Sequence, residues 1–156
     1  MATKAPAKIP VLMDTREQKG WGPELNADLF TVERGTLHTG DYSFPGLRDW
    51  EYVIERKSLG DFVGSVIQDW TRFLKELNRL KLFNSACVVV EATVEDVLAR
   101  RYESEANPLS VWGKVLTIRE RFKIGVEFWG PRAVCIAAVE RELLFMHNEL
   151  TVRGAF

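Results

Sequence analysis

Residues 51–63 read Glu51-Tyr52-Val53-Ile54-Glu55-Arg56-Lys57-Ser58-Leu59-Gly60-Asp61-Phe62-Val63, and the hydrophobic period changes within this stretch. Its first part is typical of a β-strand that ends in a charged triplet. Ser58 and Asp61 then have the spacing of a capping box, with aspartate in the place of glutamate. Apolar residues follow at helical spacing. The stretch therefore predicts a strand leading straight into a helix, with Glu55 and Lys57 on one strand face and Arg56 on the other.

Short apolar runs on the N-terminal side of this stretch predict further strands. They cover residues 10–14, 30–34 and 40–44, and Pro45-Gly46 turns the chain before the strand at 51–57. Because the strands at 30–34, 40–44 and 51–57 are short and follow one another closely, we expect them to form an antiparallel meander.

Helices and strands alternate on the C-terminal side. Apolar stripes and capping patterns mark the helices, and continuous or alternating apolar runs mark the strands. The helices are predicted for residues 62–67, 70–80, 93–96, 107–122 and from Pro131 onward, and the strands for residues 86–91 and 125–129. This order predicts an α/β fold with a central mixed β-sheet flanked by helices.

Length and composition are those of one soluble globular domain. The 156 residues are 46% hydrophobic and 28% charged, which are ordinary fractions. We expect a disordered N-terminal tail at residues 1–9, the folded domain at 10–150 and a C-terminal tail at 151–156. Neither a signal peptide nor a run long enough to span a bilayer is present, so no membrane partner is expected.

Cysteines, histidines and net charge narrow the classes of function. Cys87 and Cys135 lie in apolar surroundings and indicate buried small hydrophobic residues. His38 and His147 have no zinc-type spacing. We therefore expect an intracellular protein, cytoplasmic or nucleoid-associated, or nuclear in a eukaryote. Because 21 basic and 22 acidic residues give a formal net charge of −1, DNA binding would need positive charge concentrated on one face.

Glu55 and Lys57 are the strongest candidates for chemistry. A carboxylate at a strand end can hold Mg²⁺ or Mn²⁺, and a neighbouring ammonium can orient water and stabilise charge on a phosphate. Asp41, at the start of the preceding strand, is the natural second carboxylate. The Glu-x-Lys pattern alone is weak, because residues 17–19 repeat it in a loop and a cross-strand ion pair explains it as well.

Several linked motifs place this pattern in a wider context. The chain carries Asp14-Thr15-Arg16-Glu17, then Gly40-Asp41, and then Glu55-Arg56-Lys57, which Asp61 follows after three residues. In order and spacing the sequence closely resembles the nuclease domain of the XPF family of structure-specific endonucleases, over about residues 10–150. The strand Val88-Val89-Val90-Glu91 fits too. The resemblance implies that the α/β fold is of the restriction-endonuclease-like type.

The resemblance also implies a role for each matching residue. Asp41 and Glu55 would bind the divalent metal, and Lys57 would position the attacking water. Accessory residues of the site would be Asp14, Arg16, Glu17, Arg56 and Asp61. Contacts with DNA would come from Arg16, Arg56 and Arg72. For Arg16 and Arg56, salt bridges to Asp61 or Glu17 are an equally open alternative, because arginine pairs with carboxylate as readily as with phosphate.

The function implied by the resemblance is a metal-dependent endonuclease that hydrolyses phosphodiester bonds at branched, flapped or forked DNA, in repair or recombination. Two alternatives stay open: a non-catalytic DNA-binding or dimer-partner module of the same fold, and a nuclease acting on linear DNA or RNA. The filled acid and lysine positions favour the active form. Many family members add a helix-hairpin-helix module or a helicase, for which 156 residues leave no room, so a separate partner could supply DNA affinity.

The final helix and the tryptophans indicate surfaces for other molecules. Because the resemblance implies dimerisation and this helix is apolar on more than one face, we expect a homodimer through the C-terminal helices. A helix buried within its own domain is the alternative. Trp70 and Trp112 fit helical apolar stripes and are expected in the core, whereas Trp21 and Trp50 lie in predicted loops and could stack on bases.

Overall fold

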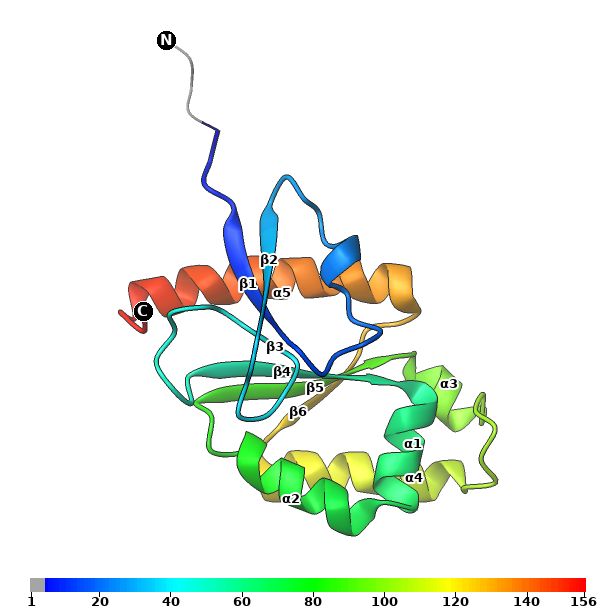
Figure 1. Ribbon diagram of the computed structural model, residues 1–156. Helices are drawn as coiled ribbons and strands as arrows, with labels where there is room; N and C mark the ends of the chain where they lie inside the picture. The colour runs from blue at the N-terminus through cyan, green and yellow to red at the C-terminus, as the bar shows by residue number, and fades with distance from the viewer. Residues whose placement is uncertain (1–4) are drawn as a thin grey trace.

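A mixed six-stranded sheet runs through the computed structural model, which describes residues 5–156 (Figure 1). The strands are β1 (Ile9–Asp14), β2 (Phe30–Gly35), β3 (Tyr42–Ser43), β4 (Tyr52–Ser58), β5 (Ser85–Glu91) and β6 (Gly125–Phe128). The α-helices are α1 (Leu59–Ile67), α2 (Trp70–Leu80), α3 (Val94–Leu98), α4 (Pro108–Thr117) and α5 (Arg132–Val152). A short 3-10 helix covers Gly22–Glu24, and a π-helical turn covers Ile118–Phe122. The predicted α/β fold with a mixed sheet flanked by helices is confirmed.

The strand order is β2-β1-β3-β4-β5-β6, which corrects the expected meander of β2, β3 and β4. Strands β3 and β4 are antiparallel as predicted, but β1 lies between β2 and β3. Strand β1 pairs with β2 in parallel, with Ile9 opposite Phe30. A parallel pair needs a long crossover instead of a tight turn, and residues 15–29 provide one.

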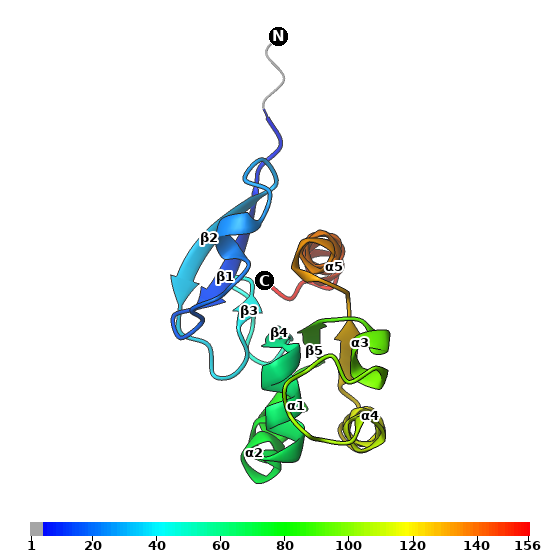
Figure 2. The ribbon, with the colours of Figure 1, turned by 90° about the vertical axis from the view of Figure 1, so that its right-hand side faces the viewer.

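Helices cover both faces of the sheet (Figure 2), and the side chains buried on each face form a hydrophobic cluster. Helix α5 packs on one face, whereas α1, α2 and α4 pack on the other. The alternation of strand side chains shows in β4, where Tyr52 and Ile54 join the α5 cluster and Val53 joins the opposite one. The same alternation directs Glu55 toward the α1–α2 side and Arg56 toward α5.

The junction between β4 and α1 forms where the sequence predicted it, but only half of the expected capping box is present. Strand β4 ends at Ser58, and the Ser58 hydroxyl accepts a hydrogen bond from the Asp61 backbone N–H at 3.1 Å. A reciprocal capping box forms instead at α3, between Thr93 and Asp96. Since the cap satisfies a free N–H of the first turn, the helix can start without a connecting loop.

The folded part of the chain begins and ends at slightly different residues from those expected. Residues 1–4 of the expected N-terminal tail lie outside the described part, residues 5–8 have no regular secondary structure, and β1 begins at Ile9. Helix α5 continues to Val152, and Ala155 is fully buried, so part of the segment expected as a C-terminal tail is packed on the domain. No helix within residues 5–156 is long and apolar enough to cross a membrane.

The two loop tryptophans occupy very different places. Trp21 is completely buried, so the expectation that it could stack on bases is wrong. Its ring stacks on Tyr42, and its indole N–H donates to Glu91. Trp50 is partly exposed and stacks on His38. Trp70 and Trp112, expected in the core, are only partly buried and pack against the hydrophobic cluster on the face covered by α1, α2 and α4.

Candidate active site

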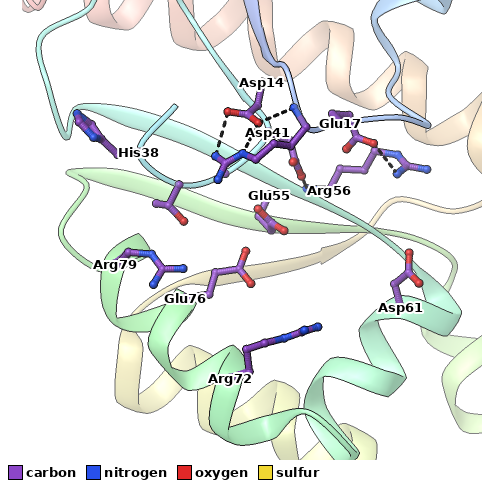
Figure 3. Close-up of a pocket in the computed structure, with 13 residues that line it drawn as sticks. Asp14, Glu17, His38, Asp41, Glu55, Arg56, Asp61, Arg72, Glu76 and Arg79 are labelled. Carbon is purple, nitrogen blue, oxygen red and sulfur yellow. Dashed lines mark hydrogen bonds and ion pairs between the residues drawn. The ribbon is translucent and has the colours of Figure 1, made fainter. Parts of the chain in front are cut away.

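A cavity of about 790 Å³ opens where the C-terminal half of β4, the loop before β3 and helix α2 meet (Figure 3). Its wall contains all but Lys57 of the nine residues that the sequence singled out. They are Asp14, Arg16, Glu17, Asp41, Glu55, Arg56, Asp61 and Arg72. The fold therefore gathers side chains from four separate stretches of sequence around one hollow.

Asp41 is held in place by contacts on both sides. Its backbone N–H donates to the Ile54 carbonyl at 2.8 Å, and its carbonyl accepts from the Asp14 N–H at 2.8 Å. Its Oδ2 accepts from the Arg56 backbone N–H at 2.7 Å. Gly40 precedes it with a φ of +84°, and a Cβ at Gly40 would overlap the Val53 side chain. Glycine is thus needed where the chain turns to present Asp41 to the cavity.

Glu55 lies beside Asp41 on the side of the sheet that faces α1 and α2. It is only 7% exposed, and its Oε1 lies 3.4 Å from the Lys57 Nζ. The Lys57 ammonium also lies 4.9 Å from the centre of the Phe73 ring. Lys57 thus lies next to Glu55 on the same face of the strand, as the alternation along the strand requires, but it is not among the residues of the cavity wall.

The two carboxylates disfavour each other's charge. Burial, reinforced by the nearby Glu17 and Glu76 carboxylates, raises the pKa of Asp41 to about 7, against the opposing effect of the Arg56 N–H. Burial, and then the charges of Asp41 and Glu76, raises the pKa of Glu55 well above its ordinary value, although Lys57 opposes this. Both carboxylates would become more favourable as anions if a cation entered the cavity.

Glu76, His38 and Arg79 also line the cavity, and the sequence did not point to them. Glu76 extends from α2 toward Glu55 (Figure 3). Its one signal in the sequence is its place three residues after Phe73, which puts it next to the buried stripe of the helix. No local pattern links this helix position to the strand, so only the docking of α2 brings the two glutamates together.

Asp14 forms a tightly bonded pair with Arg16 at the end of β1. The Asp14 side chain is almost fully buried and accepts hydrogen bonds from the Arg16 backbone N–H, Nε and Nη2 at 2.9, 2.7 and 3.0 Å. The Leu37 backbone N–H donates a fourth bond at 2.8 Å. Burial acts to raise the pKa of Asp14, but these hydrogen bonds outweigh it and lower the pKa. Asp14 thus ties β1 to the loop that carries Asp41.

We expect Asp14→Asn to destabilise the protein by about 2–3 kcal/mol at pH 7. Asparagine keeps one acceptor but turns an amide N–H₂ toward a donor. Because the folded-state pKa lies below the ordinary value of 3.8, the stabilisation is fully present above 3.8 and is lost as pH falls through the folded-state pKa. In urea unfolding, the difference in unfolding free energy between wild type and Asp14→Asn should be smaller at pH 3 than at pH 7. The exposed Asp28→Asn variant is the control. If wild type and Asp14→Asn were equally stable at pH 7, Asp14 would not stabilise the fold in this way.

The Arg56 side chain lies on the face of β4 opposite Glu55, in a buried network of charges. Its side chain is 7% exposed, its Nε donates to Glu91 at 2.8 Å, and its Nη1 lies 3.4 Å from Glu17. Trp21 and Arg132 also donate to the same Glu91 oxygen, at 2.7 and 3.0 Å. Of the two interpretations left open for Arg56, this placement favours the salt bridge. Its partners are Glu17, as considered, and more closely Glu91, but not Asp61.

Arg16, Arg72 and Arg79 form the basic rim of the cavity. The Arg16 and Arg72 side chains are 66% and 85% exposed. Arg72 has an ion pair with Asp69 at 3.6 Å, which at this exposure holds it only weakly. Asp61, at the start of α1, is exposed at the opposite end of the cavity from His38 (Figure 3). An acidic floor with a basic rim suits a phosphate that approaches a metal ion.

The donor set fits a hard divalent cation that keeps part of its water. Within residues 5–156, no three side chains of histidine, cysteine, aspartate or glutamate form a ready-made metal cage. Asp41 and Glu55 instead offer two mostly buried carboxylates beside an open cavity, and each raises the cost of the other's charge. Mg²⁺ is usually bound in this manner, by one or two carboxylates together with water and substrate phosphate.

Comparisons with known proteins show the family and the fold. Residues 13–134 match the family described as the ERCC4 domain. The fold is similar to that of XPF from Aeropyrum pernix, with a TM-score of 0.70 and 22% identity over 93% of this chain and 69% of that one. For XPF from Aeropyrum pernix in complex with DNA, the TM-score is 0.69, with 21% identity over 91% of this chain and 66% of that one. A comparison with curated proteins finds no match.

Proposed function

Because the chain belongs to the ERCC4 domain family, whose members are XPF-type nucleases, we propose that it is a divalent-metal-dependent DNA endonuclease with Asp41, Glu55 and Lys57 at its active centre. One observation carries the proposal. Two mostly buried carboxylates, Asp41 and Glu55, face one cavity that has exposed arginines around its rim, and the Lys57 ammonium lies 3.4 Å from Glu55.

The residues of the chain divide the chemistry between them. Asp41 and Glu55 hold Mg²⁺ or Mn²⁺, which when bound lowers the pKa of a water molecule and neutralises charge on the phosphate. The Arg56 backbone N–H keeps the Asp41 carboxylate oriented toward the cavity. Lys57, close to Glu55, orients the attacking water and stabilises the negative charge that develops on the phosphate.

The surrounding residues position the site and the DNA. Asp14 and Glu17 act as supporting groups through Arg16 and Arg56, and Asp61 is an accessory acid at the start of α1. Exposed Arg16 and Arg72 contact phosphates on either side of the scissile bond. The preferred substrate is branched, flapped or forked DNA inside the cell, during repair or recombination.

A cleavage assay on a panel of substrates tests the proposal. End-labelled flap, fork, four-way junction and linear duplex DNA, and a single-stranded RNA, are incubated with the protein in Mg²⁺, Mn²⁺ or EDTA. We expect cleavage of the branched DNAs with either metal and none in EDTA. DNA binding without cleavage in either metal would support a non-catalytic module, and equal cleavage of linear DNA or RNA would remove the preference for branches.

We expect a homodimer formed through α5. Ile136, Leu143 and Met146 are buried within the domain and so account for the inward face. Val134, Phe145 and Val152 are 57%, 61% and 78% exposed. They are separated by whole numbers of helical turns and form an outward apolar stripe.

Light scattering after size exclusion should give twice the monomer mass for the wild type. Phe145→Glu should weaken dimerisation by at least about tenfold, because it places a charge in the centre of the stripe. Leu109→Glu, at an exposed leucine of α4, is the control and should stay dimeric. A monomer mass at high protein concentration would contradict the dimer.

A further inference from the structure

His38 and Trp50 form a stacked aromatic pair at one end of the catalytic cavity. Their ring centroids are 5.3 Å apart, and their planes differ by 15°. His38 lies in the cavity wall, at the end away from Asp61 (Figure 3). Trp50 lies behind it, in a neighbouring pocket that His38 also lines. The pair thus connects the catalytic cavity with an aromatic surface beside it.

Trp50 is held in place by contacts with Phe83 and Asn84. Its ring forms a T-shaped pair with Phe83, with centroids 5.1 Å apart and planes at 68°. Its carbonyl accepts a hydrogen bond from the Asn84 backbone N–H at 2.7 Å. Its φ of +64° places a bulky residue in the left-handed region, which costs free energy and tends to occur where function requires a particular orientation. The indole is therefore a preformed support for the imidazole.

The outer face of His38 is open. Its side chain is 66% exposed although one ring face lies against Trp50. Its Nε2 lies 3.9 Å from an Asp49 oxygen, and the Asp49 side chain is itself 77% exposed. Such a pair is held weakly in water. The imidazole thus presents one free aromatic face at the end of the cavity whose wall also holds Asp41 and Glu55.

We propose that His38, supported by Trp50, stacks on an unpaired base of the DNA strand that enters the cavity, and so directs cleavage to the edge of a single-stranded segment. This rests on the proposed endonuclease function. Asp41 is three residues from His38, so their Cα atoms are at most about 11 Å apart. At a stacked rise of about 3.4 Å per nucleotide, the base lies within a few nucleotides of the scissile phosphate.

An unpaired base is the occupant that fits a single free ring face. Within a continuous duplex both faces of a base are covered by its neighbours, so a protein ring cannot stack on it. Unpaired bases expose their faces and stack readily on aromatic side chains, including histidine. The neighbouring cavity rim supplies arginines for the phosphates of the same strand. The preference for branched DNA would then come from this one contact.

Forked DNA with 2-aminopurine placed in turn at each unpaired and paired position near the junction tests the proposal. Binding is measured with Ca²⁺ in place of Mg²⁺, and the DNA is checked for integrity afterwards. We expect fluorescence quenching at one unpaired position and about tenfold weaker fork binding by His38→Ala than by wild type, with a much smaller loss on linear duplex. His38→Phe should restore fork binding, whereas His38→Lys should not. Asp49→Ala, which keeps the stack, should bind the fork like wild type.

The outcomes separate this proposal from the proposed function. If the wild type cleaves forks with Mg²⁺ but His38→Ala binds fork and duplex with unchanged preference, stacking is refuted and the endonuclease stands. Rescue by lysine but not by phenylalanine would also refute it, because the contact would be ionic. If 2-aminopurine fluorescence were quenched only at a paired position, His38 would be stacking on the end of the duplex, and the proposal would be refuted. If the wild type neither binds nor cleaves DNA, both ideas fail.

Discussion

Replacing Asp41 by asparagine is expected to lower cleavage by roughly a thousandfold while leaving the metal-free protein at least as stable as the wild type. The loss of activity follows from removing one of two carboxylates that face the cavity. Asparagine retains an oxygen that can accept the Arg56 N–H, so the local geometry is kept. The substitution therefore tests the negative charge of Asp41 while keeping the shape of its side chain.

The stability effect has a defined dependence on pH. The pKa of Asp41 in the folded protein is about 7, above its ordinary value of 3.8, so the metal-free wild type loses stability as pH rises from 3.8 through 7. The Asp41→Asn variant lacks this loss. At pH 8 it should be more stable by up to roughly 2 kcal/mol, since part of the Asp41 side chain is in contact with water. Near pH 4 the two proteins should be alike.

Metal binding provides a second measurement that does not depend on cleavage. Thermal melts at pH 8 should show the wild type gaining stability as Mg²⁺ or Mn²⁺ is added, because an ion that binds only the folded state stabilises it. The variant should gain much less, and exposed Asp28→Asn, as the control, should behave like wild type. A strongly destabilised Asp41→Asn protein without metal would mean that Asp41 is a structural acceptor and that the assigned site is wrong.

Replacing Lys57 by alanine should lower the rate of cleavage by about 100- to 1000-fold and change DNA affinity little. Lys57 lies next to Glu55 and is not part of the cavity wall, so we expect it to stabilise charge without forming the binding surface. Lys57→Arg should not restore the rate, because a planar guanidinium cannot replace a compact ammonium packed on Phe73. Single-turnover rates beside binding curves separate these two effects.

Lys75→Ala, at an exposed lysine of α2, is the matched control and should cleave at the wild-type rate. Lys57→Ala should also destabilise the metal-free protein, because it leaves the buried Glu55 without its cation, and added metal should recover part of the loss. An unchanged rate for Lys57→Ala would show that Lys57 is only the ion-pair partner of Glu55.

Local sequence determined which helices and strands form around the site and which face of β4 each charged side chain lies on. The change of hydrophobic period at residues 51–63 was enough to predict β4, α1 and the split between Glu55 and Arg56, because strand alternation and helix capping depend only on neighbouring residues. The mixed sheet flanked by helices followed from the order of such elements. The linked motifs also led to eight of the residues that line the cavity.

Long-range packing decided the rest. The sequence alone did not show that β1 would separate β2 from β3, that Arg56 would turn to Glu91, or that Trp21 would be buried against Tyr42. Periodicity tells which face of an element is buried, but not which distant element covers it. The approach of Glu76 to Glu55, and of the His38–Trp50 pair to the same cavity, depends on how a helix and a loop dock on the sheet, and only the tertiary structure determines that.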